Sequence, residues 1–232
     1  MKYIGLNTLL ASVMLALSSC LTVNGPSPSG QQKSKTEWKS FFDGKKLGNW
    51  AITDFAGKGE VSIDENGSLV LGMGIELTGV HWTGKGDYPT IDYEIALSAK
   101  RAQGGDFFCG LTFPYEESNA TLILGGWGGA LVGISSLDDF DASENDTGDV
   151  YAFEENRWYD VRLRVTKAKF EAWIDKKQIV NCEIHDRKVS MRAGEVEMSA
   201  PLGLCTYATT GVIRNIRIRE LSDEEVQSQT KK

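Results

Sequence analysis

The chain has 232 residues and a formal net charge of −7, with 25 Lys and Arg residues against 32 Asp and Glu residues. An acidic chain without a run of basic residues lacks the electrostatic signature of a nucleic-acid-binding protein or of one that adheres to anionic lipid. With residues 1–36 and 222–232 set aside, the chain keeps one domain's length, enough to bury a core without disulfides or metals.

The first 19 residues have the pattern of a signal peptide. Lys2 gives a positive start, and the apolar and small-residue run over Ile4–Leu17 follows. This run is shorter than the roughly 20 residues that cross a bilayer. Cys20 follows Leu17-Ser18-Ser19, which resembles the lipobox of bacterial lipoproteins. The resemblance implies that Cys20 becomes the first mature residue and carries lipid; the alternative is an ordinary secreted protein cleaved nearby.

We therefore expect an exported protein, periplasmic or on the cell surface, that touches a bacterial envelope membrane only through its lipid anchor. Residues 20–36 are rich in Ser, Pro, Gly and Gln and have no apolar period, which predicts a flexible tether. Residues 37–221 are expected to form a single domain. Residues 222–232 (SDEEVQSQTKK) are polar, and we expect a disordered tail there.

Alternation of apolar and polar residues dominates the domain, and helical periodicity is nearly absent. The clearest cases are Ile91–Ser98 and three successive segments, Val161–Val165, Lys169–Ile174 and Gln178–Ile184, which predict an antiparallel meander. Further strands are expected at Val61–Ile63, Leu69–Met73, Gly79–Trp82, Phe107–Phe113, Thr121–Leu124, Ala130–Ile134, Leu202–Tyr207 and Val212–Arg219. A dozen or so strands with regular turn signals predict an all-β fold, an antiparallel β-sandwich of the jelly-roll type.

The most informative segment lies between Gly104 and Thr147. Two expected strands there lead into Gly125-Gly-Trp127-Gly-Gly, where glycines permit positive φ or a close approach. A Trp127 ring held between glycine pairs can stack on a sugar, or it can be a structural ring in a glycine-rich corner. Asp106 opens the first strand after a glycine pair, where it can act as a base or merely cap a turn.

An acidic loop follows this corner. Glu144 and Asn145 carry groups that can bind sugar hydroxyls, although a solvated polar loop explains them equally well. The same loop has Asp138, Asp139 and Asp149, whose oxygens suit a divalent cation such as Ca²⁺, but their spacing is not that of an EF-hand. No cofactor is implied with certainty.

On the meander, Trp173 lies on the polar side of its strand, and Arg162 and Arg164 lie on the polar side of the neighbouring strand. An outward Trp beside Arg is unusual for a solvated face and suggests a ligand surface; a cation–π cluster or a cover from the N-terminal segment is the alternative. His81 is a candidate acid or base at neutral pH, although a lone exposed His is commonly incidental.

Three cysteines remain beyond Cys20, namely Cys109, Cys182 and Cys205, and an odd number cannot pair completely. Cys182 and Cys205 can be joined in principle, but spacing does not establish a disulfide. All three lie in apolar strand patterns, which favours buried free thiols.

Two framework motifs resemble the 3-keto-disaccharide hydrolase domain family, a group of concanavalin A-like sandwiches. The motifs are Phe41-Phe-Asp-Gly-Lys45 with Leu47 and Trp50, and Arg214-Asn-Ile-Arg-Ile-Arg-Glu-Leu221. The resemblance implies cleavage of glycosides whose C3 hydroxyl is a ketone, through a base near C2 and a stabiliser for the enolate oxygen. Where family members often carry Glu and Asp on a strand, this chain has TLILGG from Thr121.

These observations leave three hypotheses open. The first is a carbohydrate-active hydrolase or lyase, with Asp106, Glu144 and His81 as catalytic candidates. The second is a lectin-like module that binds sugars without cleaving them. The third is a structural domain without a sugar site. Both sugar hypotheses require acids, guanidinium groups and indole rings to converge on one groove.

Overall fold

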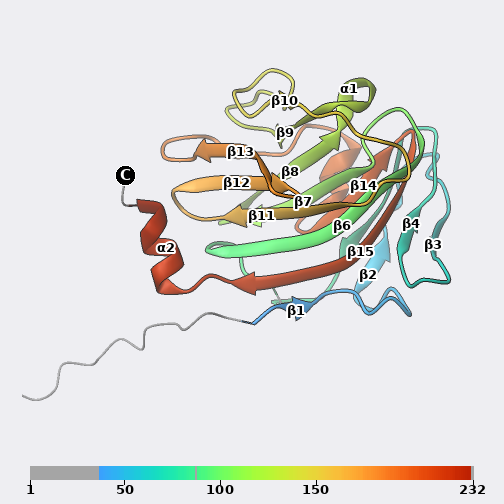
Figure 1. Ribbon diagram of the computed structural model, residues 1–232, viewed down its shortest axis with the longest axis horizontal. Helices are drawn as coiled ribbons and strands as arrows, with labels where there is room; N and C mark the ends of the chain where they lie inside the picture. The colour runs from blue at the N-terminus through green and yellow to red at the C-terminus, as the bar shows by residue number, and fades with distance from the viewer. Residues whose placement is uncertain (1–36, 87, 231–232) are drawn as a thin grey trace, which may run out of the picture. The chain divides into compact units, whose positions relative to one another are not determined.

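The computed structural model describes residues 37–86 and 88–230, so the expected signal peptide, Cys20 and the tether lie outside the described residues. The described chain forms two antiparallel sheets of eight and seven strands (Figure 1). We call them sheet A, ordered β13-β12-β11-β6-β15-β4-β3 with β1 beside β15, and sheet B, ordered β10-β9-β8-β7-β14-β5-β2. The predicted antiparallel β-sandwich is confirmed.

The elements follow one another along the chain with these bounds. They are β1 (Lys39–Ser40), β2 (Trp50–Ile52), β3 (Val61–Ile63), β4 (Leu69–Leu71), β5 (Leu77–Trp82), β6 (Tyr93–Gly104), β7 (Cys109–Tyr115), β8 (Ser118–Gly125), α1 (Gly126–Gly129), β9 (Leu131–Ser135), β10 (Asp149–Val150), β11 (Tyr159–Val165), β12 (Lys169–Ile174), β13 (Lys177–Glu183), the 3₁₀ helix η1 (Glu195–Ser199), β14 (Gly203–Tyr207), β15 (Thr209–Glu220) and α2 (Asp223–Thr230).

The core lies between the sheets and is built by the alternation seen in the sequence. On β11, Val161, Leu163 and Val165 are buried, while Arg162 and Arg164 on the other side of the strand are only half-buried. Sheet B contributes fully buried rings such as Phe113, which packs edge-on against Phe170 of sheet A at a ring-centroid distance of 5.2 Å. Burying each such ring contributes about 1.5–3 kcal/mol. The predicted meander of β11, β12 and β13 is confirmed by their antiparallel pairing.

The C-terminal segment differs from expectation. Residues 223–230 form the helix α2 where we expected a disordered tail. Ser222 and Glu225 make a capping box: the Ser222 backbone N–H donates to Glu225 Oε2 at 3.0 Å, and the Glu225 N–H donates to Ser222 Oγ at 3.3 Å. Arg219 then binds Glu225 through two hydrogen bonds of 2.7 and 2.9 Å. In the described part of the chain, no helix has the length and apolar character needed to span a membrane.

Two loops meet over the outer face of sheet B, and we call this pairing the clasp. The first loop follows β9, and the second follows β13. Residues Ser136–Asp138 of the first loop form backbone hydrogen bonds with Lys188–Ser190 of the second loop. Four ion pairs of 2.6–2.8 Å then join the loops: Asp138–Arg187, Asp146–Arg187, Asp139–Lys188 and Asp141–Arg192. The two loops therefore form one cover, held largely by charge.

The cysteines Cys109, Cys182 and Cys205 are buried and free, so the expectation of free thiols is confirmed and a Cys182–Cys205 disulfide is ruled out. Burial raises the thiol pKa of Cys205 to about 12. These groups therefore behave as small apolar side chains rather than as nucleophiles.

Candidate functional site

A cavity of about 420 Å³ opens on the outer face of sheet B, between the sheet and the second loop of the clasp. Its volume lies within the range of about 300–1,000 Å³ that is typical of small-molecule sites. The lining combines aromatic, charged and small side chains: Glu76, Leu77, Asp106, Phe107, Thr121, Ile123, Trp127, Ser135, Arg192, Ala193, Gly194, Glu195, Val196 and Tyr207.

Thr121, Ile123 and Ser135 lie on central strands of sheet B and form the floor of the cavity. Pairing places Thr121 beside Ser135 of β9 and beside Thr112 of β7, whose hydroxyl lies 2.9 Å from that of Thr121. The next row holds Gly79, Cys205, Gly110, Ile123 and Gly133. Because this row is mostly glycine, a ligand in the cavity can approach the backbone of the sheet closely.

The Trp127 ring forms one wall. It lies in the tight turn α1, where Trp127 and Gly128 have φ of 48° and 86°, and it is 45 % exposed. Asp106 holds this turn, since its Oδ2 accepts a hydrogen bond from the Gly128 N–H at 3.1 Å and its Oδ1 accepts one from the Phe107 N–H at 2.8 Å. Asp106 thus caps the turn, as one reading of the sequence proposed, and also lines the cavity, as the other required.

A second aromatic surface is formed by Phe107 and Tyr207. Their ring centroids lie 5.9 Å apart with planes inclined by 35°. Phe107 lies directly after Asp106, and the Tyr207 N–H donates to the Phe107 carbonyl at 3.0 Å. The cavity therefore offers aromatic rings from three separate segments, together with carboxylates that can accept hydrogen bonds from hydroxyl groups.

Arg192 brings positive charge to the cavity. Its Nη1 donates to Asp141 Oδ2 at 2.6 Å, and its guanidinium carbon lies 5.8 Å from the centroid of the Trp127 ring. Asp141 also accepts a short hydrogen bond from Ser135 Oγ. Ser135 and Asp141 thus fix the direction of the Arg192 side chain, whose outer part is exposed and available to a ligand.

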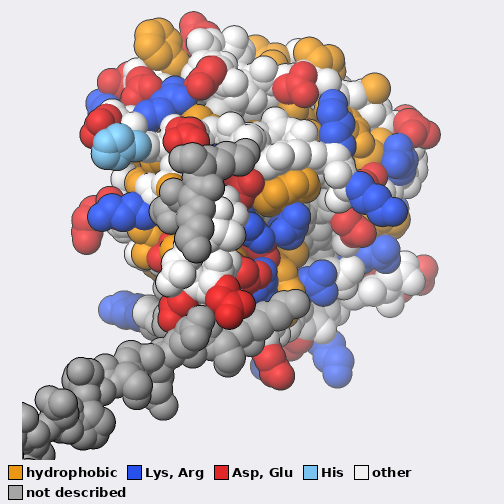
Figure 2. Space-filling model, turned by 60° about the vertical axis from the view of Figure 1, so that its left-hand side comes forward, with side chains coloured by type: hydrophobic (Ala, Val, Ile, Leu, Met, Phe, Trp, Pro, Cys, Tyr) orange, Lys and Arg blue, Asp and Glu red, His pale blue; other side chains and the backbone are white. Residues whose placement is uncertain are grey.

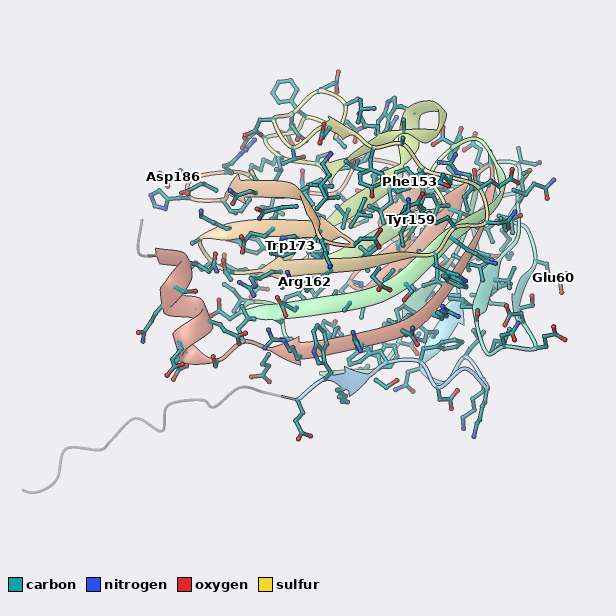
Figure 3. All side chains as sticks on the ribbon, in the orientation of Figure 1. Glu60, Phe153, Tyr159, Arg162, Trp173 and Asp186 are labelled. Carbon is teal, nitrogen blue, oxygen red and sulfur yellow. The ribbon has the colours of Figure 1, made fainter. Side chains whose placement is uncertain are left out.

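The predicted ligand residues of the meander lie elsewhere. Arg162 and Trp173 lie side by side on β11 and β12 of sheet A (Figure 3), and the Arg162 guanidinium carbon is 3.8 Å from the Trp173 ring centroid. Glu94 accepts hydrogen bonds from Arg162 at 2.8 Å and from Arg164 at 2.9 Å. The expectation that these residues share one groove with Asp106 is wrong, and the cation–π alternative describes them instead.

The acidic loop is the first loop of the clasp, which explains its composition. Glu144 is exposed and does not line the cavity. Asn145 bonds within its own loop: its Nδ2 donates to the Ile134 and Phe140 carbonyls at 2.8 and 3.0 Å, and its Oδ1 accepts from Thr147. The structure therefore supports the reading of a structural loop for Asn145.

His81 does not line the cavity either, and its Nδ1 lies 3.0 Å from Thr53 Oγ1. The aspartates that suggested a cation site form ion pairs with different basic residues. Asp138 and Asp139 pair with Arg187 and Lys188 inside the clasp. Asp149 pairs with Lys177 at 3.6 Å. Within residues 37–86 and 88–230, no three His, Cys, Asp or Glu side chains are grouped to hold a metal ion.

Several lining residues were not found from the sequence. Tyr207 ends an expected strand, and its outward direction follows from the alternation around Leu204. Arg192, Glu195 and Val196 come from an irregular segment without a periodic pattern, so no local signal identified them. They reach the site only because the clasp folds this segment over sheet B.

Similar solved structures include a protein assigned as a β-glucanase from Mycobacterium abscessus (12 % identity, TM-score 0.50, covering 80 % of this chain and 100 % of that one). A carbohydrate-binding module, CBM66, from Bacillus subtilis is also similar (14 % identity, TM-score 0.46, covering 74 % of this chain and 96 % of that one). At such identities, the β-glucanase likeness shows a shared fold alone.

A search of curated proteins found no match. A family model described as the 3-keto-alpha-glucoside-1,2-lyase-like domain matches residues 37–219, which is most of the chain and all of the sandwich. This match confirms the resemblance seen in the framework motifs and makes the domain a carbohydrate-active one. The chain belongs to the 3-keto-alpha-glucoside-1,2-lyase-like domain family.

Proposed function

We propose that the chain binds a 3-keto-glycoside in the cavity on sheet B and cleaves it by elimination across C1 and C2. One observation carries this proposal: a carboxylate, a guanidinium group and aromatic rings line the same cavity of about 420 Å³, through Asp106, Arg192, Trp127 and Tyr207. Family membership supplies the substrate class, and the cavity supplies the groups that such a reaction needs.

The proposed reaction begins at C2 of the sugar. The C3 ketone makes the C2 proton acidic, and Asp106 takes this proton, leaving the electron pair delocalised onto the C3 oxygen as an enolate. The electron pair then forms the C1–C2 double bond while the glycosidic C1–O bond breaks. The leaving oxygen takes up a proton from solvent, and addition of water to the unsaturated product would complete a net hydrolysis.

Arg192 is the group we assign to the enolate oxygen. Of the lining residues that the structure describes, it alone is cationic, and Asp141 fixes its orientation before a ligand arrives. A preoriented positive charge stabilises a developing anion without reorganisation during the reaction. The proposal therefore assigns the stabilising role to this side chain.

The experiment follows release of the aglycone from a 3-keto-glucoside and from the same glucoside without the ketone. We expect release from the 3-keto-glucoside alone. In D106N the rate of release should fall by about 100-fold or more, as for loss of a general base. E144Q is the matched control, because Glu144 is an exposed acid outside the cavity. Equal rates in D106N and the parent protein would refute the proposed base.

A second candidate function is binding without cleavage. It is favoured by the hydrogen bonds that occupy both Asp106 oxygens and by the absence of carboxylates along Thr121–Gly125. In that case the protein would bind both glucosides saturably, release nothing, and lose affinity in W127A. The same titration, read by calorimetry and by product release, distinguishes the two functions.

We also propose that the protein is exported and lipid-anchored through Cys20. The support is the sequence alone, namely the Leu-Ser-Ser-Cys motif after a short apolar run. Incorporation of a labelled fatty acid in the parent protein but not in C20S would support the anchor. Labelling that persists in C20S would contradict it.

A further inference from the structure

The outer face of sheet A carries a group of positively charged side chains apart from the cavity. Lys100 of β6 and Arg214 and Arg217 of β15 project from this face, and Trp158 lies beside them just before β11. Figure 2 shows acidic and basic side chains interspersed over the end of the domain that it displays. Against that mixture, we call Lys100, Trp158, Arg214 and Arg217 the cationic patch.

A β-bulge creates the patch. In a regular strand, residues three apart point to opposite faces, but Arg214 and Arg217 both lie on the outer face. Between them the register of β15 against β6 shifts, so that Arg214 pairs with Ser98 and Arg217 with Ala96, the next outward position of β6. Asn215 takes φ of 58° in the bulge, which Asn tolerates better than most residues. Bulges of this kind commonly redirect side chains at binding sites.

The cations of the patch are not neutralised by the domain. Within the described residues, no carboxylate forms an ion pair with Lys100, Arg214 or Arg217, although most of their neighbours on this face are paired. Asp160 is the nearest carboxylate by register, two strands from Arg214, and it accepts its hydrogen bond from Ser98 at 2.7 Å. Buried Glu94 binds Arg162, Arg164 and Arg219 instead, and Glu171 and Glu225 are further acidic partners of Arg164 and Arg219.

Two of the cations are held over one ring. The Arg214 guanidinium carbon lies 4.0 Å from the Trp158 ring centroid, and Lys100 Nζ lies 5.0 Å from the same centroid. A guanidinium group carries its N–H donors around its planar edge, where they can bind a carboxylate or sulfate with two hydrogen bonds. Arg214 Nε is buried and has no partner among the described residues.

We propose that the cationic patch is a second binding site, and that its ligand is an anionic glycan bearing carboxylate or sulfate groups. The charge of the patch is complementary to such a chain, and the Arg214 guanidinium group beside Trp158 supplies planar N–H donors for its anionic groups. We choose a glycan as the partner because the domain is carbohydrate-active. The site is independent of the cavity, so it stands even if the proposed reaction does not.

The test measures binding of tetragalacturonate, with neutral maltotetraose as its comparison, by calorimetry on the whole protein. We expect saturable binding of tetragalacturonate alone, weakening as salt rises. R214Q/R217Q should reduce the affinity about tenfold or more, as loss of charge-assisted hydrogen bonds does. K45Q/K46Q removes the same charge at two exposed lysines that are not members of the patch and should change the affinity less than about twofold.

Further variants distinguish a loss of binding from a loss of folding. R214K/R217K keeps the charge and removes the planar donors, so partial loss is expected; thermal unfolding of each variant checks that it is folded. W127A, in the cavity, should bind tetragalacturonate normally. Absence of saturable binding, equal loss in both double glutamine variants, or tighter binding to phosphatidylglycerol vesicles or a DNA duplex than to the glycan would overturn the proposal.

Discussion

Glu94 and Arg219 lie opposite each other on β6 and β15. Glu94 Oε2 accepts a hydrogen bond from Arg219 Nε at 2.8 Å and forms an ion pair with Arg219 Nη2 at 2.6 Å. Only 1 % of the Glu94 side-chain surface is exposed, against 5 % for Arg219. Since the other Glu94 oxygen binds Arg162 and Arg164, one buried carboxylate holds three guanidinium groups in place on sheet A.

The first prediction concerns this carboxylate. E94Q should lower the free energy of unfolding by about 3–5 kcal/mol, because removing one partner of a buried ion pair leaves the others uncompensated. Urea denaturation monitored by tryptophan fluorescence measures this difference. E144Q is the control, since Glu144 is exposed, and a loss below about 1 kcal/mol in E94Q would mean that the network contributes little to stability.

The second prediction concerns pH and the docking of α2. Hydrogen bonding from Arg219 is the main cause that lowers the pKa of Glu225 from its ordinary value of 4.5 to about 2. A carboxyl with a lowered folded-state pKa stabilises the fold above its unfolded-state pKa, and this contribution disappears as the pH falls through the folded-state value. The stability difference between the parent protein and E225Q should therefore be full above about pH 5 and shrink toward zero near pH 2. Urea denaturation at several pH values tests this, and a constant difference would contradict it.

Substitutions of Trp127 and Trp173 distinguish ligand binding in the cavity from ligand binding on the outer face of sheet A. W127A should weaken saccharide binding by up to about tenfold, the contribution expected of one aromatic contact. W173A should leave that affinity unchanged, because Trp173 packs under Arg162 on the other sheet. Calorimetric titration with the 3-keto-glucoside gives both numbers. An effect of W173A equal to that of W127A would place the ligand on sheet A instead.

A glycine of β14 provides a test of packing. A Cβ added at Gly203 would lie 2.3 Å from the Ser199 carbonyl oxygen, which is backbone and has no room to yield. G203A should therefore destabilise the protein by about 1–3 kcal/mol through overpacking. At Gly105 nothing lies within 4 Å of such a Cβ, so G105A should stay within about 0.5 kcal/mol of the parent. Similar stabilities of the two variants would show that η1 does not rest on Gly203 in solution.

The sheets were predictable because each strand has one buried face, so apolar and polar residues alternate along its sequence. The helix α2 was missed, although Ser222 and Glu225 have the spacing of a capping box. The polar composition of residues 222–232 concealed this signal. Tertiary contact with Arg219 supplies the remaining stabilisation, and a sequence does not display such a contact.

The site was predictable only where it is local. Asp106 and Trp127 flank one hairpin, and their glycine neighbours marked both of them. Arg192 comes from the clasp and carries no such mark. Arg162 and Trp173 misled because alternation tells on which side of a strand a residue lies. Alternation does not tell whether the charged side chain is already bound to another residue, as Arg162 is to buried Glu94.

The clasp also has a consequence for how the protein responds to its surroundings. Four ion pairs join the second loop, which covers the cavity, to the first loop. Most of the charged groups in these pairs are partly in contact with water, where dissolved ions screen them. The roof should therefore loosen in brine while the sandwich beneath stays intact. Affinity for even an uncharged sugar would then vary with ionic strength, so a protein in a salty habitat and one in a dilute habitat would hold the same ligand differently.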